Sequence, residues 1–217
     1  MSATRTVPIL AALVLGAALP ANAQTGFLRT LDVSGGPTMY FVRQGTDVDA
    51  NSRTGTWAGA QGSVREGRID IQVRGLFGSL SGSSPGLAQR VRETGLGVTM
   101  PVRPWLDVGV DVEALRLSSD LAVMVWRLYG VRAAVSHSLG LRGLAGRAEF
   151  TIYPLTSVAA ARPLRRPMRA EVGLSYVTPL LPLEVGFGYR VESIDFEDTN
   201  DLRLAGLLVG VTVRHGR

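Results

Sequence analysis

The sequence predicts an all-β fold, an antiparallel, up-and-down transmembrane β-barrel of ten strands, with eight strands as the alternative. Three observations lead to this prediction. Apolar and polar residues alternate with a period of two along most of the chain, which is the period of a β-strand. The alternating segments are about ten residues long, the length that a tilted strand needs to cross a bilayer. Short turns and longer loops follow one another in regular order, as in an up-and-down barrel.

The N-terminal segment predicts export from the cytoplasm. Arg5 precedes an apolar run from Val7 to Leu19, and Ala21-Asn22-Ala23 supplies the small residues that signal peptidase cuts. The apolar run is shorter than the roughly 20 residues that a membrane helix needs. We therefore expect residues 1–23 to be a signal peptide and residues 24–217 to form the outer-membrane barrel as one domain.

The composition excludes several kinds of site. The chain has no cysteine, which rules out disulfides, thiol chemistry and thiolate metal sites. Every one of its 23 basic residues is arginine, and the formal net charge is +5. The arginines are scattered singly along alternating segments and form no basic patch in the sequence, which argues against nucleic acid as a partner. No phosphate-binding glycine loop or nucleotide motif is present.

The clearest strand pattern runs from Leu106 to Glu113, where four aliphatic residues alternate with three carboxylates and a glycine. The same period recurs in 69–74, 144–152, 168–176 and 183–192, and a helical period would mix the two faces of each segment. From the C-terminus backwards, we expect strands near 201–214, 182–195, 167–178, 142–153, 122–137, 105–117, 94–102, 67–78, 52–62 and 28–43.

The turns set the expected orientation. Short turns are predicted at 102–104, 139–141 and 179–182, and longer polar or glycine-rich loops separate them. An even number of strands brings both termini to one end of the barrel, together with the short turns. In outer-membrane barrels this end faces the periplasm, so the longer loops should lie outside the cell.

Alternation alone does not say which face is outside, and a soluble lipocalin-like barrel with its charges in water is the main alternative. The charged face also carries glycines, which suit the crowded interior of a narrow barrel. Aromatic residues near the strand ends are expected to form two outward girdles at the membrane interfaces. The glycines are Gly109, Gly173, Gly186, Gly188, Gly206 and Gly210; the aromatic residues are Trp105 and Tyr176 beside the turns, and Trp126, Tyr153 and Tyr189 towards the loops.

With the apolar face outward, the charged residues of the strands must share the lumen. An arginine in that interior keeps its proton and needs a carboxylate partner, so cross-strand ion pairs should close the lumen. Paired carboxylates for acid–base catalysis are the weaker alternative. The predicted network comprises Asp70, Arg74, Asp107, Asp111, Glu113, Arg147, Glu149, Arg169, Glu171, Glu184, Arg190, Glu192 and Arg214.

The segments from Ile69 to Arg214 resemble the small outer-membrane β-barrel proteins of Gram-negative bacteria, the group that includes the OmpA-like and OmpW-like barrels. The resemblance implies an outer-membrane location, contact with outer-membrane lipid and lipopolysaccharide, and insertion by the barrel assembly machinery. Such proteins usually end in an aromatic residue, whereas this chain ends at Arg217; Gly206, Val209 and Val211 keep the rest of the terminal spacing.

Some outer-membrane barrels are enzymes, among them a phospholipase, a lipid A deacylase and the omptin proteases, and they use a histidine near the outer leaflet. His137 lies between two serines, but it and His215, the second of the two histidines, fall at the predicted periplasmic end. We therefore expect no enzyme, and no catalytic residue, metal or cofactor. A structural or loop-mediated role with a closed, charge-paired lumen is expected, and a narrow porin-like channel or small-solute carrier is the alternative.

Two loops suggest ligands. The loop from Leu155 to Pro167 carries three arginines that we expect to face the phosphates of lipopolysaccharide. Acidic residues of the first and last outer loops could bind calcium together, against the alternative of two solvated acidic loops. The loop arginines are Arg162, Arg165 and Arg166, and the acidic-loop residues are Asp47, Asp49, Asn51, Asp195, Glu197, Asp198 and Asp201.

Overall fold

The computed structural model describes residues 31–46, 52–81, 90–119, 122–160, 164–165, 167–195 and 202–215, and ten strands make up nearly all of them. The strands are β1 (Leu31–Thr46), β2 (Ser52–Glu66), β3 (Ile69–Ser81), β4 (Arg90–Arg103), β5 (Leu106–Ser118), β6 (Val123–Ser138), β7 (Leu144–Ala160), β8 (Met168–Val177), β9 (Leu183–Ile194) and β10 (Leu202–His215). This confirms the all-β fold and the count of ten strands.

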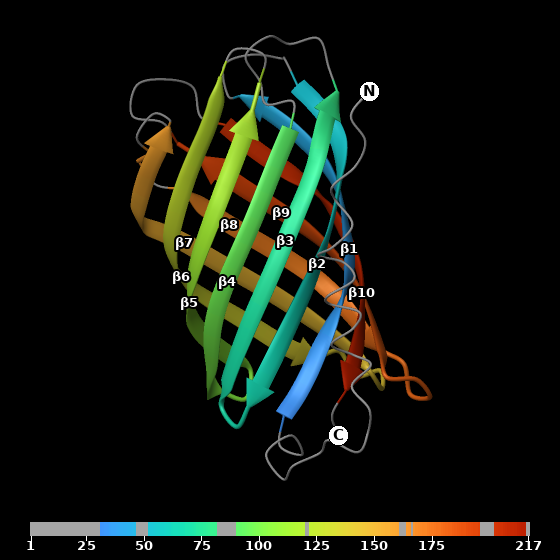
Figure 1. Cartoon of the computed structure of the whole chain (residues 1–217). Helices are drawn as coiled ribbons and strands as arrows, with labels where there is room; N and C mark the ends of the chain where they lie inside the picture. The colour runs from blue at the N-terminus through green and yellow to red at the C-terminus, as the bar shows by residue number, and fades with distance from the viewer. Residues whose placement is uncertain are drawn as a thin grey trace, which may run out of the picture.

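The sheet closes on itself. Each strand pairs antiparallel with its neighbours in the sequence, and β1 completes the barrel by pairing with β10. At this seam Met39 lies opposite Val209, and Phe41 lies opposite Leu207. The strands are strongly tilted, and the start of β1 and the end of β10 lie at the same end of the barrel as the β2–β3 turn (Figure 1). Closure leaves no unpaired strand edge, so every strand of the wall has two partners.

The connections differ at the two ends. At the turn end, β2 and β3 are joined by Gly67 and Arg68 alone, and Gly67 has a φ of 58°, as a tight hairpin needs. Gly143, in the β6–β7 turn, has a φ of 85°. The other end, where β1 meets β2 and β9 meets β10 through longer connections, is called the loop end here. Short and long connections alternate as predicted except at β5–β6, where the four residues between Ser118 and Val123 are fewer than the five of the β6–β7 turn.

Three strands extend at least four residues beyond their predicted bounds, and one of them is β2, which continues to Glu66 beyond the expected end at 62. β4 begins at Arg90, four residues before its expected start, and β7 continues to Ala160 beyond the expected end at 153. Pro154 favours a strand end at 153, because proline cannot donate a hydrogen bond to a sheet ladder. In the structure Pro154 is exposed and lies beside a register shift in the β6–β7 pairing, between Tyr129 and Val131. The irregularity accommodates the proline.

The outward face of the barrel is apolar. On β5 the outward residues from Leu106 to Ala114 are all aliphatic, and the same holds from Ala205 to Val213 on β10. The inward positions between them on β5 include Asp111 and Glu113, which are both buried. This is the reverse of a lipocalin-like barrel. Among the described residues, no helix is long and apolar enough to cross a membrane.

A second apolar cluster lies inside the barrel, at the loop end, and we call it the apolar plug. It comprises Tyr40, Val42, Trp57, Leu80, Val91, Leu115, Leu117, Trp126, Leu128, Tyr153, Leu164, Ile194, Leu202 and Leu204. The prediction of two aromatic girdles is therefore wrong for Trp126 and Tyr153, which are fully buried in the plug. Trp105, Tyr176 and Tyr189 do face outward, as predicted.

Candidate functional site in the barrel lumen

The lumen contains three layers along the barrel axis. A polar cavity lies at the turn end, a network of ion pairs fills the middle, and the apolar plug occupies the loop end. The layers follow from the strand pattern, because inward positions carry polar residues near the turns, charges at mid-strand and large apolar side chains near the loops.

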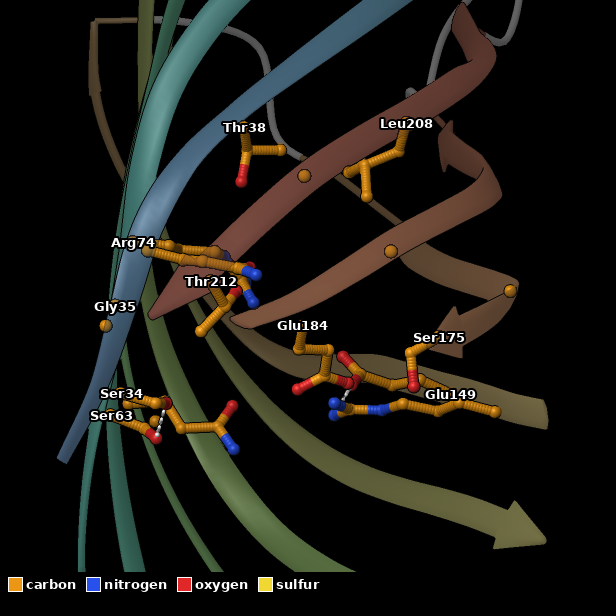
Figure 2. A pocket seen from close by; sticks show the side chains of 18 of the residues that line it. Ser34, Gly35, Thr38, Ser63, Arg74, Glu149, Ser175, Glu184, Leu208 and Thr212 are labelled. Carbon is orange, nitrogen blue, oxygen red and sulfur yellow. Dashed lines mark hydrogen bonds and ion pairs between the residues drawn. The ribbon is translucent and has the colours of Figure 1, made fainter. Parts of the chain in front are cut away.

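The turn-end cavity has a volume of about 390 Å³. Its lining is polar, and the hydroxyls of Ser34 and Ser63 are hydrogen-bonded across β1 and β2 at 2.9 Å. Figure 2 shows Ser34 and Ser63 on one side of the cavity, with Glu184 and Glu149 on the side opposite. Inward glycines on β4, β8, β9 and β10 keep the cavity open, since they place no side chain in it.

Three ion pairs surround the cavity. Arg147 donates to Glu149 at 2.7 Å, Arg65 lies 3.3 Å from Asp70, and the Nε of Arg214 donates to Glu184 at 2.8 Å. The arginine of each pair is about half exposed. Pairs in contact with water contribute little to stability, typically about 0–1 kcal/mol. These pairs shape the cavity more than they hold the barrel together.

The central network is built around Glu113 of β5. Its Oε2 accepts hydrogen bonds from Arg74 at 2.5 Å, from Arg169 at 2.6 Å and from the Tyr153 hydroxyl at 2.9 Å. Glu113 is fully buried, and its three donors come from β3, β8 and β7. The carboxylate therefore links strands from opposite walls of the barrel through the lumen.

Glu93 of β4 is the second centre of the network. It lies 3.0 Å from the Nε of Arg74, 2.6 Å from Arg190 and 3.5 Å from Arg169. Arg190 also pairs with Glu192, its neighbour on the inward face of β9, at 2.9 Å. In this layer three arginines share three glutamates, so opposite charges balance.

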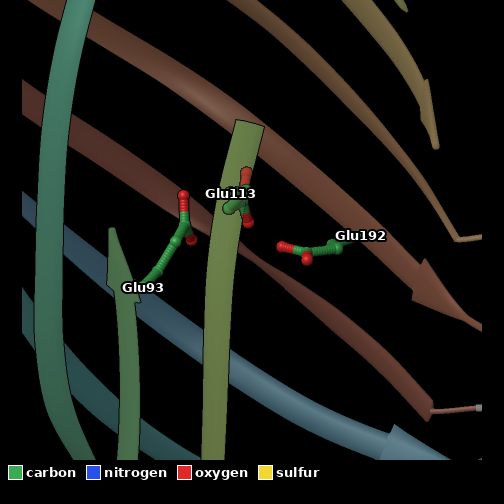
Figure 3. Close-up of side chains that lie close together, drawn as sticks. All are labelled: Glu93, Glu113 and Glu192. Atoms are coloured by element: carbon green, nitrogen blue, oxygen red, sulfur yellow. The ribbon is translucent and has the colours of Figure 1, made fainter. Parts of the chain in front are cut away.

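The three glutamates of the central network point towards one another (Figure 3). One oxygen from each lies within 4.8 Å of the others, a spacing that a cation could bridge. Arg74, Arg169 and Arg190 already neutralise the three carboxylates. A cation would have to compete with buried guanidinium partners, so the arrangement fits ion pairing better than metal binding.

A further group adjoins the network on the side of the cavity. Arg132 of β6 lies 3.6 Å from both Asp111 and Glu149, and its Nη2 donates to Gln72 at 2.9 Å. Arg132 and Asp111 are both buried. Gly97 makes room for this group, because a Cβ at that position would overlap the Asp111 carboxylate.

Two tyrosines join the network to the apolar plug. The guanidinium of Arg169 stacks 5.6 Å from the centre of the Tyr153 ring, and that of Arg190 lies at the same distance from the Tyr40 ring. The Tyr40 hydroxyl donates to the backbone carbonyl of Arg190 at 3.0 Å. On the plug side, Tyr40 packs edge-to-face on Trp57, with ring centres 5.3 Å apart. The rings thus present a polar side to the charges and an apolar side to the plug.

Most of the predicted charge set meets in the lumen. Asp107 and Glu171 occupy inward positions, but neither forms an ion pair with another described residue. Glu93 and Arg132 belong to the network and were not predicted. The residues in ion pairs are Arg74, Asp111, Glu113, Glu149, Arg169, Arg190 and Glu192 in the middle, and Asp70, Arg147, Glu184 and Arg214 around the cavity.

The structure describes only some residues of the other predicted sites. His137 is exposed near the turn end of β6. Of the lipopolysaccharide loop, Arg165 is exposed and its amide donates to the carbonyl of Asp195, while Arg162 and Arg166 lie outside the described residues. Of the acidic loops, Asp195 alone is described, and it accepts a hydrogen bond from Ser193. Asp47, Asp49, Asn51, Glu197, Asp198 and Asp201 lie outside the described residues.

The fold and the lumen define a class: a closed, ten-stranded antiparallel barrel that is apolar outside and charged within. No protein-family model matches the chain, so none assigns it to the OmpA-like or OmpW-like subtype, and no curated protein matches it either. Similar solved structures exist. Neisserial surface protein A (NspA) has 16% identity and a TM-score of 0.42, over 86% of this chain and 97% of that one.

Two further solved structures have lower scores. The outer membrane channel DcaP of Acinetobacter baumannii has 11% identity and a TM-score of 0.36, with 80% of this chain and 62% of that chain covered. The outer membrane protein opdK from Pseudomonas aeruginosa has 9% identity and a TM-score of 0.32, with 85% and 99% covered.

Proposed function

We propose that the protein is an outer-membrane barrel that does not conduct solutes, and that it acts as a membrane anchor presenting its loops at the cell surface. The observation that carries this proposal is the apolar plug, whose fourteen buried side chains fill the lumen at the loop end. A water-filled channel needs a continuous polar path, and the plug interrupts it. Function is then left to the loops and to the outer wall.

The outer wall supports the membrane location. From Val33 to Phe41 on β1, from Leu106 to Ala114 on β5 and from Ala205 to Val213 on β10, no outward position is charged. Each run covers about nine residues, close to the length of a tilted strand that crosses the hydrocarbon core. A soluble protein rarely exposes so large an apolar area.

The middle layer supports a closed lumen. Arg169 and Arg190 are almost completely buried, and each contacts at least two carboxylates. Charges held in this way leave neither sign free to attract permeating ions. The central network and the plug thus form two successive barriers.

Single-channel recording in planar bilayers tests the proposal. The wild type should show no steady conductance, and the double variant Trp57→Ala/Trp126→Ala should show more frequent openings, because it removes the two largest plug side chains. Trp105→Ala is the matched control, since Trp105 faces outward beside a turn. Steady open conductance of the wild type would overturn the closed-lumen proposal, whereas failure to insert into the bilayer would count against the membrane location.

The turn-end cavity favours a second candidate, a small-solute carrier. The cavity is polar and about 390 Å³ in volume, which suits a molecule of the size of a sugar or an amino acid. Liposome swelling distinguishes the candidates. A carrier would let small sugars or zwitterions enter proteoliposomes at a saturable rate, and an anchor would not.

The resemblance to small outer-membrane barrels extends the proposal to partners. We infer that the barrel assembly machinery inserts the chain through β10, which carries Gly206, Val209 and Val211 at the expected spacing. In the structure Val209 and Val211 face outward and Gly206 faces inward. We propose no catalytic role for the lumen, because its buried carboxylates are already paired with arginines.

A further inference from the structure

At the loop end of five strands, β1, β4, β5, β6 and β10, apolar residues face inward and arginines face outward, the reverse of the middle of these strands. On β5, Leu115 and Leu117 point inward on the same face as Glu113, while Arg116 between them points outward. On β6, Arg127 is outward between the buried residues Trp126 and Leu128. We call the outward arginines at this level the arginine collar: Arg43, Arg90, Arg92, Arg116, Arg127 and Arg203, all exposed.

The collar lies directly above the apolar band. Arg43 follows Phe41 as the next outward residue of β1, Arg116 follows Ala114 on β5, and Arg203 precedes Ala205 on β10. A band of about nine residues spans the thickness of the hydrocarbon core, so the next outward residue lies in the headgroup region. The paired seam strands β1 and β10, and β5 on the other side of the barrel, each place an arginine just beyond this band.

The collar concentrates positive charge. Arg92 and Arg116 are direct cross-strand partners on β4 and β5, and Arg127 lies opposite Ala114 on the next strand. Like charges directly opposite one another destabilise a sheet. Among the described residues, neither Arg92 nor Arg116 has an ion-pair partner, and no outward carboxylate lies at this level of the strands. The described part of the wall therefore supplies no counter-charge to this pair.

A groove accompanies the collar at the barrel seam. It is open on the outer wall, has a volume of about 670 Å³ and is lined by residues of β1, β2, β9 and β10 and by Ser81 of β3. Arg43 and Arg203 lie at its loop-end side, and Phe41, Tyr189 and Leu207 line it towards the apolar band. The register places Arg43 opposite Ala205 and Arg203 opposite Gly45, so the two arginines are diagonal neighbours. Diagonal neighbours in an antiparallel pair are about 7–8 Å apart, a separation that a single phosphate group would span between two arginine side chains.

We propose that the arginine collar binds the phosphate groups of lipopolysaccharide in the outer leaflet, and that the seam groove takes part of one acyl chain. Guanidinium groups bind phosphate through paired, charge-assisted hydrogen bonds. A lipid with two phosphates on one headgroup and several acyl chains matches paired arginines above an apolar groove. This inference rests on the outer-membrane location proposed above, and it concerns the outer wall, independently of the lumen and the loops.

Co-purified lipid tests the proposal. Folded protein is mixed in detergent with bisphosphorylated lipid A, with EDTA present to remove bridging cations, and the bound lipid is counted by native mass spectrometry. The wild type should retain lipid A, and Arg92→Ser/Arg116→Ser should reduce retention by about tenfold through loss of two charge-assisted contacts. Arg43→Ser should weaken retention to a smaller extent, because Arg203 remains at the groove.

The double variant Arg68→Ser/Arg103→Ser is the matched control, since it removes two exposed arginines from the turn end. It should retain lipid A as the wild type does, and gel mobility before and after boiling shows that each variant is folded. Equal retention of dephosphorylated lipid A, of phosphatidylglycerol or by the Arg92→Ser/Arg116→Ser variant would overturn the proposal. A wild type that fails to insert into bilayers would instead count against the outer-membrane location.

Discussion

At the scale of single residues, Glu113 accepts hydrogen bonds from three side chains, more than any other carboxylate of the described lumen. One of its oxygens accepts two guanidinium hydrogen bonds and one phenol hydrogen bond, and the residue has no exposed surface. A buried carboxylate is costly to desolvate, and that cost is offset only when its lone pairs are well satisfied. Arg74, Arg169 and Tyr153 donate to its Oε2 from three different strands, whereas its Oε1 has no hydrogen-bond partner among the described residues.

Glu113→Ala should therefore destabilise the barrel by about 3–5 kcal/mol, since two buried guanidinium groups lose a partner. Glu171→Ala should cost far less, because Glu171 lines the cavity and has no ion pair among the described residues. Urea unfolding in detergent measures both, and Val172→Leu on the outer wall serves as the neutral reference. A similar loss for Glu113→Ala and Glu171→Ala would contradict the assignment of the central network.

The sequence predicts most of this network but misses two members. Glu93 is in phase with the inward residues Gly95, Gly97 and Thr99, yet the predicted strand began at 94 and excluded it. Extending the predicted strand by one residue towards the N-terminus includes Glu93 on the inward face. Arg132 stands alone among aliphatic neighbours on β6, and no local signal shows that Asp111 and Glu149 reach it from two adjoining strands.

At the scale of elements, five strands, β1, β4, β5, β6 and β10, exchange polarity between their two faces towards the loop end. In β5 the inward face carries Asp111 and Glu113 at mid-strand and then Leu115 and Leu117, while the outward face changes from aliphatic to Arg116. The period of two continues unbroken, and only the polarity exchanges faces. In the proposed membrane location, this change marks where a strand leaves the hydrocarbon, because polar outside and apolar inside is the pattern of a barrel in water.

The sequence contains this reversal, but an assignment of apolar residues to the outside along whole strands overlooks it. The same assignment placed Trp126 in an outward girdle, although its phase with Arg132 on β6 puts it in the lumen. If every second residue of a strand is assigned to the same face along its whole length, whatever its polarity, the plug residues of β5 and β6 are placed inside the barrel. The predicted inward glycines were chosen by phase, and Gly109, Gly188 and Gly210 do face the lumen.

Leu115→Ala should lower the free energy of unfolding by about 2–5 kcal/mol, because it leaves a cavity in a dry, packed cluster. Val112→Ala on the outer face of the same strand should cost less than half as much, since mobile lipid or detergent fills the space that it leaves. Urea titration of the two variants under identical conditions compares them. Equal costs would show that the loop-end lumen is not packed as a core.

At the scale of the whole molecule, the pairing of β1 with β10 closes the sheet into a barrel. Twelve register partners join the first strand to the last, from Val33 and His215 to Thr46 and Leu202. Sequence patterns could not choose between eight and ten strands, because the alternation in β1 and β2 is interrupted by Pro37 and by small residues. Closure decides the number, and closure depends on residues far apart in the chain.

A disulfide can test the seam, because the chain has no cysteine of its own. Met39→Cys/Val209→Cys places two thiols on directly opposed residues. The Cα atoms of opposed residues in an antiparallel pair are about 4.5–5.5 Å apart, within the usual disulfide range of about 4.4–6.8 Å. Oxidation should join the ends of the chain and change its mobility after boiling. Met39→Cys/Val213→Cys is the control, since Val213 lies opposite Gly35; equal cross-linking of both pairs would contradict the register.

The arginine collar also bears on how the chain reaches its final position. If the turn end stays in the periplasm, every collar arginine must pass through the hydrocarbon core on the lipid side of the wall. An arginine at the bilayer midplane costs about 2–4 kcal/mol, so several crossing together form a kinetic barrier that spontaneous insertion into a thick bilayer overcomes slowly. The same barrier opposes the return passage. The arginines that would bind the surface lipid would thus also keep the barrel in one orientation, once an assembly factor has inserted it into the bilayer.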